Sequence, residues 1–126
     1  MHVRTATLDE VPALMNVLDG AVLSIAVETV RAGAEDDSTL VAVSGDNETD
    51  GRVLGALVLD GTHIEAVAVR RRRRGQGIGT ALVESALDRR DRLTAEFDAD
   101  VRPFYEALGF AIEPLDEPSR FRGELG

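Results

Sequence analysis

The sequence predicts a single α/β domain of the mixed α+β type, with a central, mostly antiparallel sheet and helices on both faces. Its 126 residues suffice for one hydrophobic core and are too few for two domains. Segments with strand and helix periodicity follow in the order β, α, α, β, β, β, α, β, α, β, β. No internal repeat, linker or low-complexity tract interrupts them, so we assign residues 1–126 to one domain.

The N-terminal segment predicts a strand followed by two helices. Residues 2–7 alternate in polarity, which is typical of a strand. We expect Asp9 to cap a helix whose first turn contains Pro12, where the missing N–H costs nothing. Gly20 divides this helical stretch, and the second part is expected to run to about Val30. The predicted buried face consists of Leu14, Leu18, Ala21, Val22 and Ile25.

The middle of the chain predicts three consecutive strands. Residues 31–38 are polar and predict a loop. The strand-like segments 39–44 and 52–59 flank the turn cluster at 45–51, which predicts an antiparallel hairpin. After the turn at Asp60-Gly61, residues 63–69 (HIEAVAV) predict a further strand.

The last third predicts two helices and three strands. Asp88 and Arg92, at the polar end of the first helix, have the spacing of an i,i+4 ion pair. Residues 93–97 predict a strand, Pro103 suits the first turn of a short helix, and Gly109 is expected to end it. The buried face predicted for the first helix consists of Ile78, Leu82, Val83, Ala86 and Leu87. The last two strands are predicted at 110–112 and 121–125, around a turn at 114–118.

An anion site is predicted at residues 67–82, VAVRRRRRGQGIGTAL. Here a strand ends in five arginines and a three-glycine turn that opens a helix. A helix N-terminus presents unpaired N–H groups and the positive end of the helix dipole. Gly75, Gly77 and Gly79 allow the backbone to approach a phosphate closely. Their spacing fits neither the dinucleotide fingerprint nor the P-loop, so the phosphate-bearing ligand stays open at this point.

Composition excludes several functional classes. The net charge of −9 and the pI near 4.6 disfavour general binding to nucleic acid or anionic membranes. All 14 basic residues are arginine, against 23 acidic residues, which is typical of a salt-adapted, haloarchaeal protein or of a GC-rich genome. There is no cysteine, and His2 and His63 do not have the spacing of metal ligands, so no metal site is expected. No apolar leader segment is visible, so we expect a cytoplasmic protein.

Two motifs resemble those of the Gcn5-related N-acetyltransferase (GNAT) superfamily. Arg74, Gly77 and Gly79 match its R/Q-x-x-G-x-G/A signature. Downstream, at the distance typical of the family, FYEALGF at residues 104–110 is similar to its FY-x-x-LGF segment. The order of predicted elements also matches. The resemblance covers nearly the whole chain and is weakest over residues 1–40.

The resemblance implies acetyl-CoA as cosubstrate. Backbone amides of the glycine turn would bind its pyrophosphate, and arginines would contact its phosphates. The pantetheine arm would lie in a gap between two diverging strands and pair with the main chain of the first, as an added strand does. The implied cofactor-binding residues are Val67, Val69, Arg72, Arg73, Arg74, Gly75, Gln76, Gly77, Ile78, Gly79 and Thr80.

The resemblance also implies groups that handle protons. Tyr105, the one tyrosine in the chain, matches the family's usual general acid, which would protonate the departing CoA thiolate. Glu65 and His63 match positions that supply a general base, often through water. Alternation along the strand places both on one face, and the apolar neighbours Ile64 and Ala66 predict a buried Glu65 carboxylate.

One position departs from the family pattern. Many members have an asparagine seven residues before the tyrosine, whereas this chain has Asp98. A carboxylate there needs a neutralising arginine beside CoA phosphates, and Arg102 is the candidate. Asp98 and Asp100 could also face a cationic acceptor, and we assign Asp100 to a helix cap.

The leading hypothesis is an enzyme that transfers acetyl from acetyl-CoA to a primary amine by direct attack. The alternative is a non-catalytic acyl-CoA-binding or regulatory module on the same fold. Recognition of RNA by residues 70–74 is disfavoured by the acidic pI. The acceptor, a small molecule or a peptide amine, stays open, and so does the oligomeric state, although homodimers are common in the family.

Overall fold

A seven-stranded mixed sheet forms the centre of the molecule, as the sequence predicts. The computed structural model describes residues 1–20, 27–44, 52–73 and 75–126. In these residues the strand order is β1-β2-β3-β4-β5-β7-β6, and the β4–β5 pair alone is parallel. The strands are β1 (His2–Thr5), β2 (Thr39–Val43), β3 (Val53–Asp60), β4 (His63–Val69), β5 (Leu93–Asp98), β6 (Ala111–Pro114) and β7 (Arg120–Leu125).

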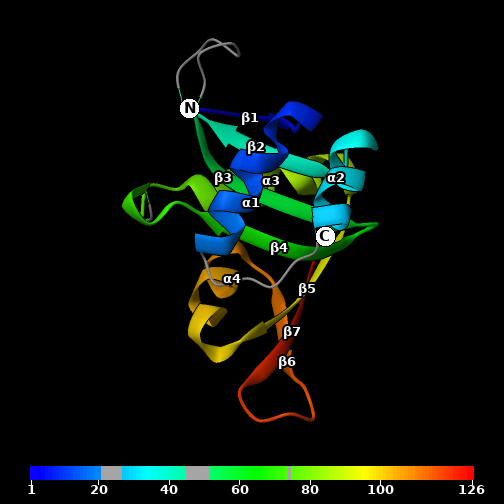
Figure 1. The fold of residues 1–126 in the computed structure, drawn as a ribbon. Helices are drawn as coiled ribbons and strands as arrows, with labels where there is room; N and C mark the ends of the chain where they lie inside the picture. Colours follow the sequence, from blue (N-terminus) through cyan, green and yellow to red (C-terminus); the bar gives the residue numbers. More distant parts are fainter. Residues whose placement is uncertain (21–26, 45–51, 74) are drawn as a thin grey trace.

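Helices cover both faces of this sheet (Figure 1). On one face α1 (Val11–Gly20) and α2 (Val27–Glu35) pack against the inner side chains of β2, β3 and β4. On the other face α3 (Ile78–Arg90) packs over β2 to β5, and α4 (Arg102–Leu108) places its aromatic residues against β5. In the described part of the chain, no helix combines the length and apolarity needed to cross a bilayer.

The N-terminal helices differ from the sequence prediction in two ways. Thr7, rather than Asp9, precedes the first helical turn, and its backbone N–H donates to a Glu10 carboxylate oxygen at 2.9 Å. The predicted loop at 31–38 is largely helical, because α2 continues to Glu35. The mid-helix residue Gly33 lies so close to Thr39 that a Cβ there would clash with the threonine hydroxyl. Three predicted core residues and the predicted hairpin turn lie outside the described residues: Ala21, Val22, Ile25 and 45–51.

The second half follows the sequence prediction closely. In α3 the predicted face is buried except for Leu87, which is half-buried, and Gly109 ends α4 with a φ of 94°. The predicted ion pair between Asp88 and Arg92 is wrong, because α3 ends at Arg90, before Arg92. Arg92 instead pairs with Glu124 of β7 at 2.8 Å.

The parallel strands β4 and β5 diverge almost from their start. They align at a single position, His63 opposite Thr94, where His63 Nδ1 and Thr94 Oγ1 lie 2.9 Å apart. Alongside β3, the register of β4 shifts between Val58 and Leu59, so that Glu65 forms a bulge. The single aligned position and the bulge open the sheet in its middle, at the gap between two strands that the family resemblance implies.

Candidate active site

A cleft of about 910 Å³ occupies the gap between β4 and β5. Pockets of this size are typical of small-molecule and cofactor sites. One wall is β4 from Ile64 to Val69, and the other is β5 from Glu96 to Asp98. The glycine turn closes one side, and the α4 residues Phe104 and Tyr105 form the floor. The cleft therefore joins the two motifs that lie about thirty residues apart in the sequence.

The glycine turn, residues 75–79, has left-handed backbone conformations that residues other than glycine adopt only with strain. Gly75 and Gly77 both have a φ of +80°, and a Cβ on either would meet no atom within 4 Å. Both glycines line the cleft, which they leave open to a ligand at the N-terminus of α3. A Cβ at Gly79 would lie 3.1 Å from Phe104 Cε1, so this glycine allows α3 and α4 to approach. The turn thus fits a phosphate group beside the first N–H groups of α3.

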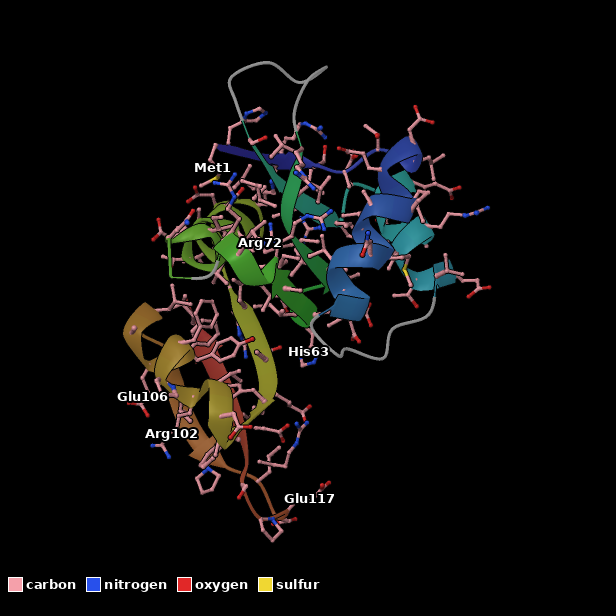
Figure 2. All side chains as sticks on the ribbon, turned by 60° about the vertical axis from the view of Figure 1, so that its left-hand side comes forward. Met1, His63, Arg72, Arg102, Glu106 and Glu117 are labelled. Atoms are coloured by element: carbon pink, nitrogen blue, oxygen red, sulfur yellow. The ribbon has the colours of Figure 1, made fainter. Side chains whose placement is uncertain are left out.

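The arginines divide between structural and cleft positions. Arg70 is directed to β3, where its Nε donates to the Val53 carbonyl at 2.6 Å. Arg73 lines the cleft, whereas Arg72 and Gln76 are exposed and lie outside its lining. Arg74 lies outside the described residues. Figure 2 shows Arg72 and His63 near opposite ends of β4. The predicted cofactor residues that the structure brings together in the cleft are Val67, Val69, Arg73, Gly75, Gly77, Ile78, Gly79 and Thr80.

Tyr105 lies at the apolar floor of the cleft and is only 5% exposed. Its ring stacks on Phe97 at 4.2 Å between centroids and meets Phe104 and Phe110 edge-on. Its hydroxyl makes no hydrogen bond within the described residues. Burial raises the pKa of Tyr105 to about 12, so its hydroxyl stays protonated and can donate a proton or a hydrogen bond.

The two predicted bases do not share one site. Glu65 lines the cleft, but its side chain is exposed, so the predicted burial is wrong. His63 does not line the cleft, and its Nδ1 is engaged with Thr94. The bulge at Glu65 breaks the alternation on which their common face was predicted. Of the two, Glu65 is the one placed to meet a molecule in the cleft.

Asp98 has a different partner from the predicted one. Arg120 of β7 lies opposite Asp98 in the sheet and donates to its carboxylate at 3.0 Å. Arg102 instead pairs with Glu106 along α4, on the outer side of that helix (Figure 2). The cap position before the helical turn at 99–101 is Asp98, so the assignment of Asp100 as a cap is wrong.

A family model decides between the possible identities of this cleft. The model described as the acetyltransferase (GNAT) domain matches residues 34–112. The chain belongs to this family. The match includes the glycine turn and the FYEALGF segment, so it confirms the resemblance, the predicted fold and acetyl-CoA as the cosubstrate.

Solved structures share the fold of this GNAT domain along its whole length. Rv2747 from Mycobacterium tuberculosis, determined in complex with CoA and NLQ, has a TM-score of 0.80 and 20% identity, covering 99% of this chain and 98% of its own. The NatC complex bound to Gag peptide and CoA has a TM-score of 0.75 and 23% identity, covering 99% of this chain and 98% of the matched chain. A ribosomal-protein-alanine N-acetyltransferase from Brucella melitensis has a TM-score of 0.70 and 21% identity, with 99% of each chain covered. No curated protein matches the sequence.

Several residues that line this GNAT cleft were not among the predicted site residues. Phe97 and Phe104 form the aromatic surroundings of Tyr105, and their positions beside the tyrosine motif could have indicated this. Glu96 and Arg120 also line the cleft. Nothing in the sequence places them there, because the pairing of β5 with β7 brings residue 120 beside residue 98.

Proposed function

We propose that the chain is an N-acetyltransferase that moves an acetyl group from acetyl-CoA to a primary amine by direct attack. The observation that carries the proposal is the position of Tyr105, a protonated phenol with no hydrogen-bond partner in the described residues, on the floor of a cleft that begins at an anion-binding helix terminus. Such a group is suited to protonate a thiolate as it leaves.

The chain's own groups would hold the cosubstrate along the cleft. The backbone N–H groups of residues 76–80 would bind the pyrophosphate, with Arg72, Arg73 and Arg74 supplying positive charge. The main chain at Val67 and Val69 would pair with the pantetheine arm where β4 has left β5. When bound, acetyl-CoA supplies an activated acetyl thioester whose C–S bond breaks as the new C–N bond forms.

Proton transfers are assigned to the two polar groups that line the reacting part of the cleft. Glu65 accepts, directly or through water, the proton that the acceptor ammonium must lose before its nitrogen can attack. Tyr105 donates its phenolic proton to the sulfur as the C–S bond breaks and regains one from solvent. His63 is the weaker candidate base, because it lies outside the cleft lining and contacts Thr94.

The acceptor is a small-molecule or peptide amine. A peptide accompanies CoA in the structure of the NatC complex, which shares this fold. We further propose a cytoplasmic enzyme without nucleic-acid or membrane partners, because the net charge of −9 opposes contact with phosphate-rich surfaces.

The proposal is tested by measuring CoA release with a thiol reagent over a panel of primary amines. We expect turnover with at least one amine and none with tertiary amines, which cannot form a stable amide. Tight binding of acetyl-CoA without turnover on any amine would overturn the proposal and support the non-catalytic acyl-CoA-binding module.

A further inference from the structure

We propose that Glu96 gives the acceptor site a preference for amines that carry a second positive charge, such as aliphatic diamines. The inference rests on the proposed acetyl transfer and adds the substrate class. It concerns the part of the cleft away from the glycine turn, where the lining changes from arginine and glycine to carboxylates.

Two carboxylates flank the point at which the sheet opens. Glu65 on β4 and Glu96 on β5 each lie two residues beyond the last aligned pair, His63 and Thr94. The bulge at Glu65 offsets β4 from β5 locally, and the two carboxylates lie on opposite walls of the same opening, one on each strand. Both side chains are exposed and both line the cleft. An acceptor bound beside Glu65 therefore occupies a cleft that Glu96 also lines.

Carboxylates outnumber arginines in this part of the cleft, which leaves it negatively charged. Four carboxylates line the cleft, namely Glu65, Glu96, Asp98 and Asp100. Among the described residues, Arg73 at the glycine turn and Arg120 are the arginines in the lining, and Arg120 donates its hydrogen bond to Asp98. That bond raises the pKa of the Arg120 guanidinium, and the charges of Glu117 and Glu96 add to the rise.

Glu96 has one further basic neighbour. Arg122 lies opposite it on β7, but its side chain lines a separate hollow with Glu113 and Glu124 and forms no ion pair with Glu96 in the described structure. Within the described part of the chain, Glu96 consequently shares Arg120 with Asp98 and forms no ion pair of its own. A ligand cation would supply one.

Tyr105 independently marks this cleft as a ligand site. Its side chain is 5% exposed, its hydroxyl has no hydrogen-bond partner among the described residues, and it lines the same cleft. The tyrosine is buried as a whole, but its hydroxyl oxygen is not among the buried polar atoms without a partner, so it is accessible to a molecule in the cleft. With Tyr105 at the sulfur and Glu65 at the reacting nitrogen, Glu96 is available for a charge elsewhere on the acceptor.

The test compares putrescine with n-butylamine, which has the same carbon chain and lacks the second amine. The full-length enzyme, Glu96→Gln, Glu96→Asp and the control Glu113→Gln are assayed for CoA release, and the ratio of kcat/KM for the two amines is taken. Glu113 is also an exposed strand carboxylate, and it lies outside the cleft lining. Circular dichroism melting confirms that each variant is folded.

We expect the wild-type ratio to favour putrescine by more than its two equivalent amines account for. Glu96→Gln should lower the ratio about fivefold to tenfold, as loss of a partly exposed charged contact does. Glu96→Asp should retain most of the preference, and Glu113→Gln should leave the ratio unchanged. An equal ratio in wild type and Glu96→Gln, or turnover of other amines but neither of these, overturns the inference and leaves acetyl transfer standing. Absence of turnover with every amine overturns both.

Discussion

At the scale of single residues, Tyr105 has the most defined chemistry. Three phenylalanines surround its ring, and burial keeps its hydroxyl protonated over the whole physiological range. Removal of the hydroxyl oxygen leaves those ring contacts in place. A change at this position therefore separates chemistry from folding.

We expect Tyr105→Phe to lower kcat by about 100-fold, the lower range for loss of a general acid. Binding of CoA, measured by calorimetry, should be nearly unchanged, because the phosphate site lies at the glycine turn. The double variant Tyr105→Phe, Phe110→Tyr moves the hydroxyl to a neighbouring ring. Its turnover shows whether a phenol elsewhere in the aromatic cluster can replace Tyr105. Unchanged turnover in Tyr105→Phe would remove Tyr105 from the mechanism.

Tyr105 also makes stability depend on pH in the alkaline range. Its pKa is about 12 in the folded protein and 10.0 in the reference state, so the unfolded chain loses this proton first. The contribution of Tyr105 to the free energy of unfolding is therefore fully present below pH 10. It falls as the pH rises toward 12, by roughly 1 kcal/mol per pH unit. The chain has no lysine or cysteine that titrates in this window. Urea unfolding between pH 9 and about 11.5 should show this fall in wild type, and its persistence in Tyr105→Phe would contradict the assignment.

The base is tested at Glu65 and His63 separately. Glu65→Gln should lower kcat/KM about 100-fold, in the range for general bases. His63→Ala should leave kcat/KM nearly unchanged, because His63 contacts Thr94 and lies outside the cleft lining. A large loss in His63→Ala alone would assign the base to His63, and unchanged kcat/KM in both variants would indicate bulk water.

At the scale of elements, the glycine turn and α3 form the phosphate site. Gly77 precedes α3 with a φ of +80°, and Gly61 in the β3–β4 turn has a φ of +62°. A Cβ meets no atom at either position, but only Gly77 lines the cleft. The two glycines therefore form a matched pair for mutation.

Alanine at either glycine should lower the free energy of unfolding by about 1–2 kcal/mol, because both positions favour glycine. Gly77→Ala should in addition weaken acetyl-CoA binding at least tenfold, since its methyl group projects toward the ligand. Calorimetric titration of both variants checks this. Equal affinities in Gly77→Ala and Gly61→Ala would move the phosphate site away from this turn.

Most elements could be predicted from sequence, because apolar residues recur four positions apart in α3 and form continuous runs between turn residues in β2 and β3. The end of α2 could not, because Gly33 and the neighbouring acidic residues disfavour a helix locally. Tertiary packing outweighs that preference: Val30 and Ala34 are buried, and Gly33 fits against Thr39. The bulge at Glu65 was also beyond reach, since it depends on the register with β3.

At the scale of the whole molecule, the sheet consists of two parts that the cleft separates. Strands β1 to β4 lie on one side, and β5, β7 and β6 continue on the other, with α4 beside them (Figure 1). The glycine turn and Arg73 supply positive charge at one part of the opening, and carboxylates line another. Sequence motifs could predict the positive part and Tyr105. The acidic part required the fold, because it is assembled from β4, β5 and β7.

The proposed function requires that this cleft hold CoA with its thiol end at Tyr105. A crystal structure of the protein with CoA would show this directly. We expect the pyrophosphate on the backbone N–H groups of residues 76–80, the pantetheine along Val67 and Val69, and the sulfur within hydrogen-bonding distance of the Tyr105 hydroxyl. Binding of CoA elsewhere, or in the cleft with its sulfur directed away from Tyr105, would contradict it.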